Sequence, residues 1–211
     1  MLPEPAVLAA FTLAAFVLIV TPGPDMTLFV GETLRGGRAR GFAAMLGAFT
    51  GILVHTLLAT VGLSALLAAS ATAYTALKIV GAIYLLWLAL QAIRHGSALT
   101  VETGSGLRRP LLQTYLMGVG INLLNPKIVM FFVTFLPQFV SVSDPHASTK
   151  LMLLGLYFNV LGLPLCAAMI LGAERLTGTI RRRPRVMRAI DWLFAGLMGA
   201  FAARLLLSRG N

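Results

Sequence analysis

The stretch TPGPD at residues 21–25 interrupts an apolar run that extends over residues 6–34. A straight helix over that run would be about 45 Å long at about 1.5 Å per residue, whereas the hydrocarbon core of a bilayer is about 30 Å thick. Proline removes a backbone donor and clashes with the preceding helical turn, so two prolines around a glycine interrupt the helix. The sequence therefore predicts two helical segments joined by unwound backbone within one membrane span.

A second break, NLLNPK at residues 122–127, interrupts the apolar run over residues 111–140. In both breaks a capping position is followed by proline at the first helical position and by a charged residue at the second, Asp25 or Lys127. Unwound backbone at membrane depth is tolerated only where protein or a water-filled cavity satisfies its polar groups. The paired breaks therefore predict a cavity.

The composition excludes a water-soluble globule. Of 211 residues, 58% are hydrophobic and only 11% are charged, against about 25% charged in soluble domains. The strands of a membrane β-barrel would be short alternating segments, whereas the apolar runs here are long and continuous. Six such runs cover residues 6–34, 41–69, 72–93, 111–140, 151–172 and 190–207. We expect an all-α membrane protein with six transmembrane helices.

The positive charges predict the direction of the chain. Lysine and arginine number 17 against 7 acidic residues, a net charge of +10, and 12 of the 17 fall between runs 1 and 2, 3 and 4, or 5 and 6. Because cytoplasmic loops carry the excess of lysine and arginine, both termini are expected outside the cytoplasm. The cluster at residues 181–188 is interpreted as a topology anchor that attracts anionic lipid, rather than as a nucleic-acid site.

Three spans in each half make the second half enter the membrane from the opposite side. This pattern is typical of an inverted-repeat transporter, whose site lies at the membrane midplane between discontinuous helices. We therefore predict one transmembrane domain over residues 1–211. It contains a first repeat at about 1–95, a cytoplasmic loop at about 95–110 and a second repeat at about 111–211, with the first and fourth helices broken mid-membrane.

The two charges at the breaks need different explanations. A carboxylate at position 25 complements the positive end of a helix dipole, which is a purely structural role. Lys127 is electrostatically misplaced at a helix start, and an unpaired charge at the bilayer centre costs about 2.5 to 3.5 kcal/mol. Either Asp25 or an anionic ligand could offset this cost. A zwitterion would suit both groups, with its carboxylate near Lys127 and its ammonium group, or a proton, on Asp25.

Two residues are candidates for proton coupling. Asp25 is ionisable and lies within a span. His55 follows Gly47 and Gly51 at steps of four, on a small-residue face that favours close helix packing, so interhelical packing and a proton-relay role both remain open. The spans hold no second mid-membrane carboxylate for a basic side chain, which favours neutral amino acids or small metabolites as substrates.

Three stretches, at residues 21–55, 78–94 and 122–140, resemble the LysE/RhtB family of bacterial amino-acid exporters, and the similarity extends over essentially the whole chain. The resemblance implies a multi-pass protein of the cytoplasmic (inner) membrane that exports lysine, arginine, homoserine, threonine or related amino acids by proton antiport. The form PGPD is more similar to the homoserine/threonine branch. The implied substrate-binding residues are Thr21, Pro22, Gly23, Pro24, Asp25, Asn122, Asn125, Pro126 and Lys127.

A channel or facilitator that uses no gradient is the main alternative, with the paired breaks forming a filter. An enzyme is not expected, because no nucleophile with a base and no metal-ligand cluster is recognisable. We predict no cofactor and no metal, and the single Cys166 cannot form an internal disulfide. The expected partners are an amino-acid substrate, protons and membrane lipids, and the small residues around Gly196 favour close packing, either within the chain or in a homodimer.

Overall fold

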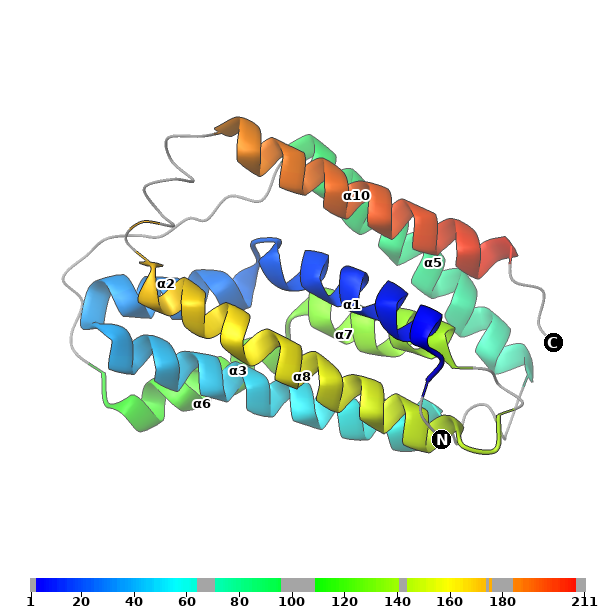
Figure 1. The fold of residues 1–211 in the computed structure, drawn as a ribbon, viewed down its shortest axis with the longest axis horizontal. Helices are drawn as coiled ribbons and strands as arrows, with labels where there is room; N and C mark the ends of the chain where they lie inside the picture. Colours follow the sequence, from blue (N-terminus) through cyan, green and yellow to red (C-terminus); the bar gives the residue numbers. More distant parts are fainter. Residues whose placement is uncertain are drawn as a thin grey trace.

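The computed structural model describes residues 3–63, 71–95, 109–140, 144–173, 175 and 184–207. Every regular element in these residues is helical, as the sequence predicts (Figure 1). The order is α1 (Pro5–Val20), α2 (Pro24–Gly36), α3 (Arg38–Leu58), η1 (Ala59–Leu63), α5 (Ala71–His95), α6 (Leu111–Leu123), α7 (Pro126–Met130), η2 (Phe131–Phe135), η3 (Leu136–Phe139), α8 (Ala147–Leu171) and α10 (Pro184–Leu207).

Four segments of the described chain meet the length and hydropathy of a membrane span. Two are the continuous helices over residues 38–62 and 147–171. The other two are bent pairs, α1 with α2 at 50° and α6 with α7–η3 at 49°, if each pair is one span. The interruptions expected in the first and fourth apolar runs are therefore confirmed. The loop predicted at about 95–110 falls on residues 96–108, which lie outside the described residues.

α3 is the central helix of one group of helices, and α2, α6 and α8 pack against it. Its contact with α6 is close because both helices present glycines to each other. A Cβ on Gly47 would lie 2.0 Å from the carbonyl oxygen of Tyr115, and a Cβ on Gly118 would lie 2.2 Å from that of Ala44. The small-residue face predicted on α3 is thus a direct helix–helix contact.

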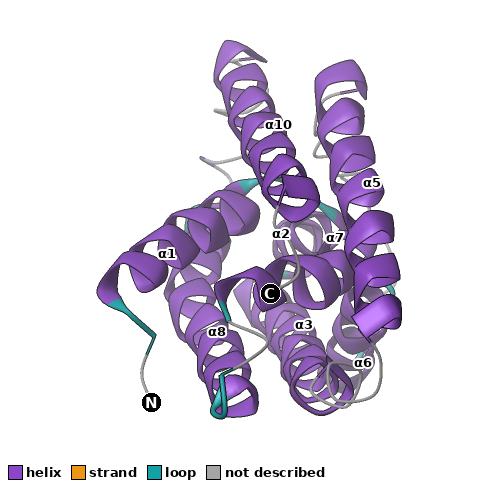
Figure 2. Ribbon diagram, turned by 90° about the vertical axis from the view of Figure 1, so that its right-hand side faces the viewer, coloured by secondary structure: helices purple, strands orange, loops and turns teal. Residues whose placement is uncertain are grey.

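α5 and α10 pack against each other as a separate pair beside the other helices (Figure 2). Buried aromatic rings connect this pair to the irregular helix η2–η3. The rings of Phe135 and Phe201 meet edge to face with centroids 3.9 Å apart, and those of Phe139 and Phe201 are 6.0 Å apart. Packing of this kind contributes to holding the pair against the broken helix.

The two broken helices continue differently after their breaks. α2 is a regular helix that ends at Gly36, and the positive φ of 86° at the next residue, Gly37, lets the chain turn directly into α3. α7 is only five residues long and passes into the π-helical turn η2 and the 3₁₀ turn η3. The sequence symmetry of the two breaks therefore does not extend to the helices that follow them.

The arginine-rich segments gather at one end of the molecule. The α2–α3 turn, the end of α5, the start of α6, the end of α8 and the start of α10 all lie opposite the start of α1 and the end of α10 (Figure 1). Among the described residues, these segments carry Arg35, Arg38, Arg40, Arg94, Arg109, Arg175, Arg185 and Arg188. These eight arginines thus share one end of the fold; Arg108 and the three arginines at 181–183 lie outside the described residues.

Candidate functional site

The first break holds the chain open between α1 and α2. Thr21 caps the end of α1 and Gly23 precedes α2 in an extended conformation, with Pro24 and Asp25 as the first two residues of α2. The hydroxyl of Thr21 donates to the carbonyl oxygen of Val17 at 2.7 Å, whereas its backbone carbonyl oxygen accepts from the ammonium group of Lys127 in the other break. α2 has no side-chain cap at its start.

The second break also has a capping residue, a proline and a charged residue in that order. Unlike the first break, it has a side-chain cap. The side chain of Asn125 accepts from the backbone N–H of Lys127 at 3.0 Å, and Pro126 and Lys127 are the first two residues of α7. The positions predicted for the cap, the proline and the charge are therefore confirmed at both breaks.

Each charged side chain reaches across to the opposite break. The Lys127 ammonium donates to the carbonyl oxygens of Leu18, at 3.0 Å, and Thr21, at 2.8 Å. The Asp25 carboxylate accepts at Oδ2 from Nδ2 of Asn122, at 2.8 Å, and from Nδ2 of Asn125, at 3.0 Å. Its other oxygen, Oδ1, is buried and has no hydrogen-bond partner.

Asp25 and Lys127, both described, are not bonded to each other. The carbonyls at the end of α1 lack helical partners and lie at the negative end of the helix dipole, so they compensate the ammonium. The amides of the second break compensate the carboxylate. Of the two options that the sequence left open for this pair, a direct ion pair is not the one present in this structure.

His55 lies behind this polar cluster. Its Nε2 is 3.3 Å from the backbone carbonyl oxygen of Asn122, and its ring stacks on Phe132 with centroids 5.9 Å apart. Asn122 is completely buried, so it connects Asp25 on one side with His55 on the other. Gly51 makes this approach possible, because a Cβ there would lie 2.4 Å from Oδ1 of Asn122.

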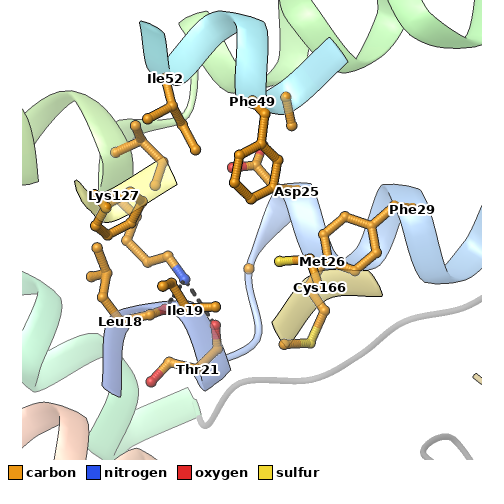
Figure 3. A pocket seen from close by; sticks show the side chains of 14 residues that line it. Leu18, Ile19, Thr21, Asp25, Met26, Phe29, Phe49, Ile52, Lys127 and Cys166 are labelled. Atoms are coloured by element: carbon orange, nitrogen blue, oxygen red, sulfur yellow. Dashed lines mark hydrogen bonds between the residues drawn. The ribbon is translucent and has the colours of Figure 1, made fainter. Parts of the chain in front are cut away.

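A small cavity opens between the two breaks (Figure 3). Among the predicted site residues, Thr21, Gly23, Asp25 and Lys127 line it, and the side chains of Asp25 and Lys127 enter it from α2 and α7. Asn122, Asn125 and His55 stand outside the lining. The cavity expected from the paired breaks is therefore present.

Most of the remaining lining comes from apolar residues that the sequence did not single out. They include Met26 and Phe29 on α2, Phe49 and Ile52 on α3, and Phe158 on α8. Nothing distinguishes these residues in the sequence from those of any other buried helix face. The two carbonyl oxygens that hold Lys127 carried no sequence signal either.

The described residues contain no group of three or more His, Cys, Asp or Glu that could hold a metal ion. The charged side chains that line the cavity are the carboxylate of Asp25 and the ammonium group of Lys127.

Comparison of the sequence with known proteins identifies the family of this chain. The family model for LysE type translocators matches residues 16–209, which include both breaks and the whole cavity. The chain belongs to the LysE family. Membership in this family identifies a multi-pass membrane transporter, the class that the resemblance indicated and that the apolar helices support.

Several relatives of this LysE family member match along most of their length. An uncharacterized membrane protein of Vibrio cholerae is 32% identical over 193 residues, covering 89% of this chain and 90% of the relative. A leucine efflux protein of Enterobacter is 28% identical, covering 92% of each chain. A homoserine/homoserine lactone efflux protein of Salmonella typhimurium is 28% identical, covering 95% of this chain and 96% of the relative. No solved structure matches.

Proposed function

We propose that this LysE family member is a secondary active exporter of amino acids or similar small zwitterionic metabolites, driven by proton antiport. The observation that carries the proposal is the cavity between the two breaks, which presents one carboxylate and one ammonium group from opposite halves of the chain. Relatives named as leucine and homoserine efflux proteins support an amino-acid substrate.

The contacts of the two charged groups suit a zwitterion. Lys127 has three N–H donors, of which two hold the end of α1, so one is left for the carboxylate of a substrate. Asp25 has one oxygen bonded to the two asparagines and one without a partner, which can accept from the ammonium group of the same substrate. The substrate would thus connect Asp25 and Lys127, which are not bonded to each other.

The unpartnered oxygen of Asp25 also gives a reason for antiport. An ammonium group and a proton both compensate the carboxylate, so binding of one disfavours binding of the other. Competition of this kind is what an exchange of amino acid for proton requires. His55 is the second candidate for proton coupling, because its Nε2 lies 3.3 Å from the backbone carbonyl oxygen of Asn122, whose side chain holds Asp25. Since the amide groups of Asn122 do not relay protons, a proton would pass between His55 and Asp25 through water.

The proposal includes the full membrane topology. α5 and α10, 25 and 24 residues long, would be the third and sixth spans and complete two inverted three-helix repeats, at about 1–95 and 111–211, in one domain. The similar bends of 50° and 49° and the mutual packing of α5 with α10 support a pseudo-twofold relation. The arginine-rich end would face the cytoplasm of a bacterium, with both termini on the outer side of the inner membrane.

The proposed site includes all the break residues, in two roles. Thr21, Gly23, Asp25 and Lys127 would contact the substrate, whereas Pro22, Pro24, Asn122, Asn125 and Pro126 would shape and hold the two openings. The expected contacts with anionic lipid at the arginine-rich end, and with a second copy of the chain along α10, are further parts of this proposal. Cross-linking in native membranes would test the homodimer.

Reconstitution into proteoliposomes tests the function. We expect efflux of a labelled neutral amino acid to accelerate when a proton gradient is imposed, and the gradient to collapse faster when substrate is present. Transport that ignores the gradient would remove the antiport mechanism and favour a facilitator. An absence of transport for every amino acid in a broad panel would remove the exporter itself.

A further inference from the structure

The cavity is polar at one side only. Away from the two charged groups, its walls are formed by the side chains of Met26, Phe29, Phe49, Ile52, Ile128 and Phe158. The Thr21 hydroxyl, the nearest candidate for a further polar contact, is already bonded to its own helix. Apart from the weakly polar thiol of Cys166, the lining therefore has no side-chain polar group left once a zwitterion occupies Asp25 and Lys127.

This division of the cavity has a consequence for the substrate side chain. A charged or strongly polar side chain would be buried against hydrocarbon and aromatic rings without a partner, at a cost of several kcal/mol. An aliphatic side chain would instead gain by burial there, by about 0.8 kcal/mol for each CH₂ group.

We infer that the cavity selects amino acids with aliphatic side chains, and that Phe49, seated on Gly162, sets the upper limit of side-chain size. The inference rests on the proposed function and names the substrate class of the same site. Phe49 is held on α3 directly beside Ala48, and both residues line the cavity. Its ring packs against Gly162 of α8, the helix that also supplies Phe158 and Cys166 to the lining.

Gly162 on α8 determines where this ring stands. A Cβ at position 162 would lie 2.9 Å from Cζ and 3.0 Å from Cε1 of Phe49, closer than carbon atoms normally approach. Because Phe49 lines the cavity and Gly162 does not, an added methyl group displaces the ring toward the cavity. Gly162 therefore lets the Phe49 ring stand further from the cavity than a larger residue at this position would.

A substrate panel on the unmodified protein is the first test. Efflux from proteoliposomes is measured for leucine, valine, alanine, serine, lysine and glutamate at equal internal concentration. We expect leucine and valine to leave at least about tenfold faster than lysine and glutamate, since a mismatched buried group changes specificity by about that much or more. Lysine or glutamate export as fast as leucine export would overturn the inference.

Two substitutions with opposite expected effects form the second test. Gly162→Ala should lower the ratio of leucine to alanine transport about tenfold, because it shallows the cavity by about one methyl group. Phe49→Ala should raise transport of phenylalanine relative to leucine. Gly62→Ala is the matched control, since this glycine is exposed and a Cβ there would meet no atom within 4 Å.

The outcomes separate this inference from the proposed function. If the unmodified protein exports amino acids but neither Gly162→Ala nor Phe49→Ala changes the side-chain preference, the size-limiting role of Phe49 is wrong and the exporter stands. If Gly162→Ala does not accumulate in the membrane, the opposite shift in Phe49→Ala decides the question. If no amino acid is exported, both proposals fail together.

Discussion

Lys127, at the start of the helix after the second break, donates a 2.8 Å hydrogen bond to the carbonyl oxygen of Thr21, at the end of the helix before the first. A cation is unfavourable at a helix N-terminus and favourable at a helix C-terminus. By reaching across, the side chain leaves the unfavourable end of α7 for the favourable end of α1. Gly23 permits this path, since a Cβ there would lie only 3.1 Å from the Lys127 Nζ.

We expect Lys127→Gln to abolish export, by at least about 100-fold, while the protein still inserts. The glutamine amide can donate to the α1 carbonyls, but it carries no charge for a substrate carboxylate, and charged hydrogen bonds contribute about 1.5 to 3 kcal/mol each. Efflux from proteoliposomes, normalised to the amount of inserted protein, measures the effect. Lys150→Gln, in the segment that pairs with Asp144, is the control; full export by Lys127→Gln would remove this residue from the mechanism.

Asp25→Asn should also abolish net export. Asparagine fills the same space beside the two break asparagines, but it neither attracts an ammonium group nor takes up a proton. We expect Asp25→Glu to retain part of the activity, because it keeps the charge and displaces it by one CH₂ group. Uptake and efflux of labelled substrate with an imposed pH gradient distinguish the two variants. Asp144→Asn, outside the apolar spans, should leave transport unchanged, and normal export by Asp25→Asn would contradict the antiport proposal.

Sequence patterns could predict the two helix breaks but not the residues that line the cavity between them. Proline and glycine act locally, so TPGPD and NLLNPK announce the interruptions and their helix starts without knowledge of the tertiary fold. The contacts of Asp25 and Lys127 depend on which groups the folded chain brings near. Because every residue has a backbone carbonyl, the sequence does not show which carbonyl oxygens will hold Lys127. Phe49 is similar: only the packing of α3 on α8 distinguishes its ring from the other buried phenylalanines.

Asn122 is expected to be needed as a positioning residue for Asp25. Asn122→Leu has a similar volume and removes the 2.8 Å donor to the carboxylate, so the side chain of Asp25 should lose its fixed orientation. We expect the KM for substrate to rise at least about tenfold, the effect of losing about 1.4 kcal/mol. Asn159→Leu is the matched control, because Nδ2 of this buried asparagine donates to Gly155 within its own helix. An equal rise of KM in both variants would indicate a general packing effect and contradict the specific role.

The ion pair between Glu32 and Arg40 is expected to contribute mainly to stability. Its atoms are 2.9 Å apart and both side chains are less than one-tenth exposed, at the turn between α2 and α3. Removing one partner of a buried pair leaves an uncompensated charge, so Arg40→Met should destabilise the protein by about 3 kcal/mol. The Tm of purified protein in detergent measures this loss. The double variant Glu32→Leu with Arg40→Met should regain most of it, and a double variant as unstable as Arg40→Met would contradict the explanation.

His55→Gln is expected to separate transport from its driving force. Glutamine can keep a hydrogen bond to the Asn122 carbonyl, which is 3.3 Å from Nε2 of His55, but it has no titratable group. If His55 passes protons to Asp25, export down a substrate gradient should persist while the acceleration by a pH gradient disappears. The exposed His146 supplies the control variant His146→Gln. Should His55→Gln keep its full response to the pH gradient, the histidine has only the packing role that its stacking on Phe132 already gives it.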